Sequence, residues 1–173
     1  MRTFLFACAL LPGALNADTL GVNFSAFPAG TVFDYSDSKE GRFAEVYMGE
    51  RGGRHVMERR KGGEYGELYF ASTFNAEGLE VERAYATGRT LRYAPYNCER
   101  VVGTCSHTVE TDRGARRVDV TTNWKGDRFV MDMQFEGVAN PRRRYFQMAA
   151  NGVVDFVREN DRQQKLEAIR APN

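Results

Sequence analysis

The chain has few of the residues on which most active sites and metal sites depend. Its 173 residues include two histidines, three cysteines and one tryptophan. Both histidines, His55 and His107, fall in segments with strand-like sequence, and a zinc site would need further His, Cys, Asp or Glu ligands close by. The Gly-x-Ser-x-Gly turn of serine hydrolases does not occur, and Gly52-Gly53 and Gly62-Gly63 lack the Lys-Ser/Thr that completes a phosphate loop. The sequence therefore predicts no catalytic, metal or cofactor site, and no enzyme.

An excess of charge of one sign is also missing. Arg2 belongs to an N-terminal segment that we expect to be removed, so the 24 basic residues less one leave 23, equal to the 23 acidic residues. A balanced chain creates no long-range field that would recruit nucleic acid or an anionic membrane surface. We therefore expect neither of these among its partners.

Long apolar runs are absent, and a short one begins the chain. Arg2 precedes an apolar run over Phe4–Leu11, and small residues follow up to Ala17, which is the layout of a secretory signal peptide. The run is far shorter than the ~20 apolar residues of a membrane-spanning helix, so we expect no stable membrane insertion. We expect residues 1–17 to be cleaved off and residues 18–173 to form a single domain outside the cytoplasm. That place is the periplasm if the source is bacterial, and otherwise the secreted fraction.

Cys98 and Cys105 are the cysteines that remain after this cleavage. An exported chain enters a compartment in which disulfides persist, and the spacing is not the Cys-x-x-Cys of redox enzymes. We therefore predict a structural disulfide between them. The closed loop is short, which corresponds to roughly 2–3 kcal/mol of stabilisation in the chain-entropy model.

What the chain does contain is a regular alternation of apolar and polar residues. One alternating run ends at Trp124, a second follows it, and Lys125-Gly126-Asp127 joins the two, as in a β-hairpin with one buried and one solvent-facing side. Four large apolar side chains of the second run share one strand face. They are Phe129, Met131, Met133 and Phe135.

Similar runs recur along the chain, separated by turn residues at intervals typical of all-β proteins. We expect an antiparallel β-barrel or barrel-like meander of roughly ten strands, with a two-sheet sandwich as the alternative. Near the C-terminus, Asp161 resembles a helix N-cap, and Leu166 and Ile169 would share a helical face, so a short C-terminal helix is expected there. Besides the hairpin, the expected strands cover 31–35, 43–48, 54–60, 68–74, 79–85, 90–93, 107–111, 145–149 and 153–158.

Two groups of charged residues are expected outside the core. Glu80 and Glu82 lie two positions apart, which predicts a shared, solvent-facing side of one strand. Arg142, Arg143 and Arg144 are expected in a loop between strands, facing water. The alternative for these arginines is contact with a phosphate or sulfate, because guanidinium groups bind such anions through paired N–H donors.

The aromatic and methionine side chains give the one hint of function. If the sheet closes into a barrel, such residues either fill the interior or line a cavity for an apolar ligand. The leading hypothesis is an exported, non-enzymatic binding protein that holds a small apolar or amphipathic ligand in the barrel. The alternative is a protein-interaction module, such as an envelope assembly factor or an enzyme inhibitor, acting through a strand edge or loop. The hypothetical ligand-lining residues are Trp124, Phe129, Met131, Met133 and Phe135.

The cleavage site gives a first testable prediction. Exported protein should begin at Asp18, because the small-residue context of a signal peptidase site ends at Ala17. N-terminal sequencing of the exported material checks this. Detection of Phe4–Leu11 in that material would contradict it.

Overall fold

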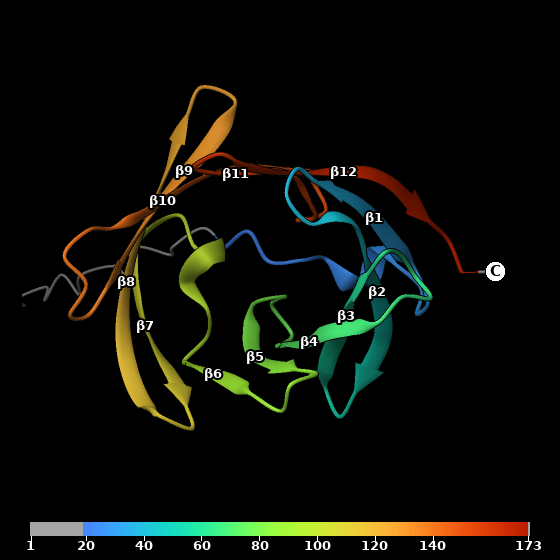
Figure 1. Ribbon diagram of the computed structural model, residues 1–173, viewed down its shortest axis with the longest axis horizontal. Helices are drawn as coiled ribbons and strands as arrows, with labels where there is room; N and C mark the ends of the chain where they lie inside the picture. Colours follow the sequence, from blue (N-terminus) through green and yellow to red (C-terminus); the bar gives the residue numbers. More distant parts are fainter. Residues whose placement is uncertain (1–18, 173) are drawn as a thin grey trace, which may run out of the picture.

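Twelve antiparallel strands close into a barrel (Figure 1). The computed structural model describes residues 19–172, so the predicted signal peptide lies outside the described residues. Each strand pairs with its neighbours in sequence, and β1 pairs with β12 to close the ring. The expected barrel is confirmed, and the sandwich alternative is wrong. The strands are β1 (Val32–Asp37), β2 (Gly41–Arg51), β3 (Arg54–Lys61), β4 (Leu68–Phe74), β5 (Glu80–Tyr85), β6 (Thr90–Ala94), β7 (Gly103–Thr111), β8 (Gly114–Lys125), β9 (Arg128–Phe135), β10 (Arg142–Met148), β11 (Val154–Glu159) and β12 (Arg162–Arg170), with two short 3-10 helices, η1 (Phe24–Ala26) and η2 (Cys98–Arg100).

Twelve strands form where roughly ten were expected, and the expected C-terminal helix is wrong. Residues Arg162–Arg170 form β12 instead. Asn160 adopts a left-handed conformation with φ of 54° in the tight turn after β11, and Asp161 lies in that turn rather than capping a helix. Leu166 lies opposite Tyr35 of β1. Pairing with β1 and β11 therefore overrides the helix preference of the local sequence.

The β8–β9 hairpin has the predicted alternation of faces. Trp124 pairs with Phe129 across the hairpin. Met131 and Met133 are buried in an apolar cluster, and Phe129 and Phe135 are half-buried against it. Trp124 lies at the end of its strand and is 60% exposed. The centre of the hairpin thus supplies core, whereas its tip reaches solvent.

The N-terminal segment crosses one end of the barrel (blue in Figure 1). We call residues 19–27 the N-terminal strap. Val22 and Phe24 of the strap are buried. The strap contacts turns that all lie at the same end of the barrel, so it closes that end. Its backbone hydrogen bonds are Leu20 N–H to Arg100 O at 2.7 Å, Val22 N–H to Gly78 O at 3.1 Å and Asn23 N–H to Asn151 O at 2.9 Å.

Glycines allow the strap to approach the two turns beside it. A Cβ atom on Gly21 would overlap the carbonyl group of Glu77, and one on Gly152 would overlap the carbonyl group of Gly21. Gly78 has a φ of 72° and lies against the backbone of Val22. Backbone therefore packs directly on backbone at this closed end.

Substitutions in β9 test the assignment of its two faces. Met131→Ala should lower the free energy of unfolding by about 2–5 kcal/mol, because it leaves a cavity in a packed cluster. Asp132 lies on the opposite face and forms an ion pair with Arg143, whose side chain is 58% exposed. Asp132→Ala removes this pair and should lower the free energy of unfolding by at most about 1 kcal/mol. Urea unfolding of the two variants measures the difference. A larger loss for Asp132→Ala than for Met131→Ala would reverse the faces.

Candidate lumen binding site

A cavity of about 440 Å³ occupies the lumen of the barrel. At one end it is lined by Val22 of the strap and by Val153, both of which are buried. At the other end it is lined by Glu40 and Arg142, both of which are exposed. The cavity is therefore a cup. Its floor lies at the strap, and its mouth lies at the end that carries the β1–β2 turn.

Aromatic and methionine side chains form part of the cup wall. Tyr35 stacks on Phe43 with ring centroids 4.9 Å apart and donates its hydroxyl to the carbonyl of Val154 at 3.1 Å. Burial raises the pKa of Tyr35 well above its ordinary value, so this hydroxyl stays neutral. Phe74 and Phe146 line the same cavity from β4 and β10. The wall thus offers apolar contact surface on both sides of the lumen.

Three ion pairs line other parts of the wall. They project from β2 and β3, from β5, and from η2 and β10, and we call them the lumen ion pairs. Buried charges are tolerated only when each has a well-placed partner. The pairs are Glu45–Arg59 at 2.5 Å, Glu80–Arg83 at 2.7 Å and Glu99–Arg144 at 2.9 Å.

Glu80 was expected on the solvent side, and that expectation is wrong. The β4–β5 register shifts by one residue, so that Glu82 lies opposite Thr73 and Glu80 lies opposite Phe74. This bulge places Glu80 and Glu82 on different faces despite their spacing. Glu82 remains outside, paired with Arg92 at 3.1 Å. Only 5% of Glu80 is exposed, and it faces the lumen.

Glu80 accepts hydrogen bonds from three side chains of the lumen. Arg83 binds it through two nitrogen atoms at 2.8 and 2.7 Å. Ser72 donates its hydroxyl to Glu80 at 2.5 Å, and Asn97 donates its side-chain amide at 3.0 Å. Four hydrogen bonds therefore hold this carboxylate, which is what a buried charge requires.

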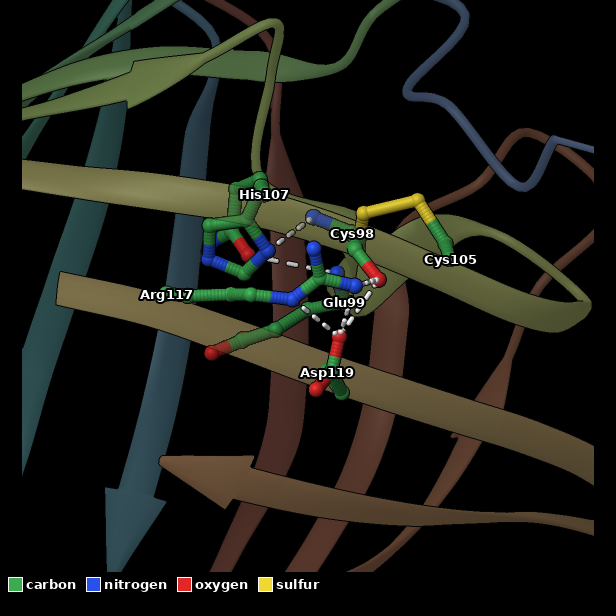
Figure 2. The surroundings of a disulfide bond; sticks show 8 residues. Cys98, Glu99, Cys105, His107, Arg117 and Asp119 are labelled. Atoms are coloured by element: carbon green, nitrogen blue, oxygen red, sulfur yellow. Dashed lines mark hydrogen bonds and ion pairs between the residues drawn. A yellow bond between two sulfur atoms is a disulfide. The ribbon is translucent and has the colours of Figure 1, made fainter. Parts of the chain in front are cut away.

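The disulfide joins η2 to β7 (Figure 2). Cys98 and Cys105 are bonded, with Cα atoms 5.7 Å apart, so the predicted pairing is confirmed. His107 accepts a hydrogen bond at its Nδ1 from the backbone N–H of Cys98 at 3.4 Å. Cys98 itself is fully buried. The short turn is thus fixed to β7, and the two residues after Cys98 line the lumen cavity.

The first of these residues, Glu99, is bound by arginine. Burial alone would raise the pKa of Glu99, but Arg144 and Arg83 lower it below its ordinary value. Arg144 also binds Glu159 at 2.9 Å, and Arg142 binds the same carboxylate. The acids and arginines therefore form a connected network from η2 to the mouth.

The expected arginine loop is also wrong, because β10 begins at Arg142. Alternation along the strand places Arg142 and Arg144 on the lumen side, where both line the cavity. Arg143 points outward and binds Asp132 at 2.6 Å. The two inward arginines already bind carboxylates of the protein. Contact of this run with an external anion remains a hypothesis.

The hypothetical ligand-lining residues are divided between core and cavity. Met131 lines the cavity. Met133, Phe129 and Phe135 belong to the apolar cluster behind it, and Trp124 lies at the exposed tip of the hairpin. The alternation in β9 predicted its inward face correctly, but nothing in the sequence indicated that charged residues of other strands, such as Glu45, Arg59 and Arg83, also line the cup. Inward charge resembles outward charge when strand facing is uncertain by one residue.

Arg100, the second residue after Cys98, lies at the floor of the cup. Its Nη1 donates to the carbonyl of Leu20 at 3.1 Å and to the carbonyl of Gly152 at 2.6 Å. Burial lowers the pKa of Arg100 from its ordinary value. No local sequence pattern distinguishes Arg100 from a surface arginine, so its position was not predicted.

Comparisons with family models, with curated proteins and with solved structures find no match. Within residues 19–172, no helix has the length and apolar character needed to span a membrane. The same residues contain no group of three or more His, Cys, Asp or Glu side chains placed to hold a metal ion. The case for a function therefore rests on the geometry of the lumen.

The stability of the protein should fall in two steps as the pH is lowered. Burial lowers the pKa of His107 below its ordinary 6.5, although Glu99, Glu80 and Asp119 act in the opposite direction. As the pH falls, His107 is therefore protonated in the unfolded chain before it is protonated in the folded chain. The stability that neutral His107 contributes is fully present above pH 6.5 and declines below it. Glu99 adds a second loss below pH 4.5, because its pKa is also lowered on folding. Urea unfolding at a series of pH values measures both steps.

A matched variant separates the two steps. His107→Asn keeps a side-chain acceptor for the Cys98 N–H but does not titrate in this range. Its stability should stay level as the pH falls from 6.5 towards 4.5, and it should then decline as in the wild type. A variant profile identical to the wild-type profile would show that His107 does not cause the first step.

Proposed function

We propose that this protein is an exported, non-enzymatic binding protein that holds a small amphipathic ligand in the lumen of its barrel. The observation that carries the proposal is the cup-shaped cavity of about 440 Å³, which is closed at the strap and open at the mouth. Cavities that bind small molecules usually measure about 300–1,000 Å³ and combine apolar walls with a few placed polar groups. The lumen has both kinds of wall.

The composition of the wall favours an amphipathic ligand over a purely apolar one. Phe74, Met131 and Phe146 offer apolar contacts, whereas Arg59, Arg83 and Arg144 expose charged edges to the same cavity. A wholly apolar ligand would displace water from these charged groups without replacing its hydrogen bonds, which is unfavourable. A ligand with one polar end avoids that loss.

The closed barrel weakens the alternative of a protein-interaction module. Each of the twelve strands pairs with a neighbour on both sides, which leaves no unpaired strand edge within residues 19–172 for a partner to extend. Such a module would have to use loops. The Cys98–Cys105 disulfide is compatible with an oxidising compartment outside the cytoplasm, which supports the export part of the proposal.

A cavity-blocking substitution tests lumen binding. Val157 lines the cavity from β11. The indole ring of Val157→Trp should fill part of the cavity, so the affinity for a ligand in the lumen should fall by about tenfold or more, because ring and ligand need the same volume. Arg158→Trp is the control, since Arg158 is exposed on the other face of the same strand. Octan-1-ol and octanoate are the probes, with affinities measured by calorimetry and bound species identified by native mass spectrometry.

Circular dichroism and thermal unfolding should first establish that both variants fold. Equal binding by folded Val157→Trp and the wild type would exclude the lumen as the site. Loss of binding in Arg158→Trp alone would move the site to the outer face of the barrel.

A further inference from the structure

The arginines of the lumen differ in how their charge is balanced. Arg59, Arg83 and Arg144 each bind a carboxylate within 2.9 Å. At the mouth, Arg142 binds Glu159, and Arg162 binds Asp37 at 2.7 Å. Arg100 is the exception, because among residues 19–172 no carboxylate oxygen lies within 4.0 Å of its guanidinium.

The nearest acids are already occupied. Glu45, Glu80 and Glu99 all act on Arg100 electrostatically. Each of them is held at short distance by another arginine, as described above for the lumen ion pairs. Arg144 has a further carboxylate partner, Glu159. The other arginines are therefore each paired with an acid, whereas Arg100 has no carboxylate partner of its own among the described residues.

The backbone fixes the direction in which Arg100 points. Its Nη1 is bound between the carbonyls of Leu20 and Gly152, one from the strap and one from the β10–β11 turn. Because a guanidinium is rigid and planar, fixing one nitrogen orients the other two. Among residues 19–172, Nε and Nη2 have no hydrogen-bond acceptor, and the residue lines the cavity. Three N–H donors are thus available to the cup.

The charge of Arg100 is energetically unfavourable at the floor of the cup when the cup contains only water. Removing a charge from bulk solvent without a counter-ion is unfavourable, and the cost is recovered only by a partner of opposite charge with good geometry. An oxyanion meets this need, because two of its oxygens match the paired N–H donors of a guanidinium. Val22, Phe74 and Val153 line the cup at the same end and offer contacts to an apolar group.

We infer that Arg100 is the anchor for the oxyanion of an amphipathic ligand, that is, a carboxylate, sulfate or phosphate joined to a compact apolar body. The inference rests on the proposed function and names the ligand class of that same site. The oxyanion lies at the floor, and the apolar body extends along the aromatic wall towards the mouth.

Octyl compounds that differ only in their polar end test the anchor. Octanoate, octyl sulfate and octyl phosphate carry the three oxyanions, and octan-1-ol carries none. Calorimetry on the wild type should give at least about tenfold tighter binding for one or more of the oxyanions than for octan-1-ol, since hydrogen bonds to charged groups are the stronger kind. The ranking of the three identifies which oxyanion the floor prefers.

Variants at position 100 assign the preference to its charge. Arg100→Met should abolish the tenfold preference for an oxyanion over octan-1-ol measured on the same variant, and Arg100→Lys should restore part of that preference. Arg92→Met is the matched control, because Arg92 is an exposed arginine on the outer face, 68% exposed and paired with Glu82. It should bind all four probes as the wild type does. Limited proteolysis of the strap checks that the floor stays closed in each variant.

The outcomes distinguish the anchor from the proposed function. If no octyl compound binds the wild type, lumen binding itself fails. If octan-1-ol binds as tightly as the oxyanions, lumen binding stands and the anchor is wrong. The anchor is also wrong if Arg100→Met keeps the preference for an oxyanion. It is equally wrong if Arg100→Lys and Arg100→Met lose that preference to the same extent while the strap stays closed. Should Arg100→Met not fold, the wild-type comparison and Arg100→Lys decide the question.

Discussion

The width of a twelve-stranded ring is the constraint on which the rest of the structure depends. A barrel of about eight strands is just wide enough for inward side chains to fill, and one of 16–18 strands leaves an aqueous channel. This barrel lies between those sizes. Its lumen is reduced by three devices: the strap across one end, the η2 turn folded into the interior, and long arginine side chains that reach inward. A cavity of about 440 Å³ remains.

The lumen ion pairs follow from the same constraint. Arginine and glutamate are long enough to extend from the wall into a space that leucine or valine would leave empty. Arg144 illustrates this, because it starts on β10 and reaches both Glu99 of η2 and Glu159 of the neighbouring strand β11. Buried ion pairs add little net stability, but loss of one partner leaves an uncompensated charge. Their main effect here is to fix the shape and the charge of the cup wall.

Strand positions and the disulfide could be predicted from the sequence because they depend on local patterns. Alternation at Met131 and Met133 identifies an inward face wherever the strand pairs. Pairing with distant strands has no local signal, and so β12 resembled a helix until its contacts with β1 were known. The bulge opposite Thr73 likewise turned Glu80 inward, although its spacing from Glu82 predicted a shared face.

The cup was beyond prediction for a different reason. Whether an inward face fills the interior or lines a cavity depends on the number of strands in the ring, and an additional strand such as β12 widens the lumen without changing the local pattern of the others. Arg100 depends on the same global arrangement. It follows Cys98 and Glu99 in sequence, and only the inward fold of η2 brings it to the lumen.

Closure of the floor and the charge of the floor are one structural feature. The guanidinium of Arg100 holds the carbonyl of Leu20 in the strap and the carbonyl of Gly152 in the β10–β11 turn. The backbone of Arg100 in turn accepts the N–H of Leu20. If the strap left this end, Arg100 would lose an acceptor that orients it, and the lumen would open at both ends. A cup with a directed cation at its base therefore exists only while the strap is docked, which makes the strap as much a part of the proposed site as the residues that line it.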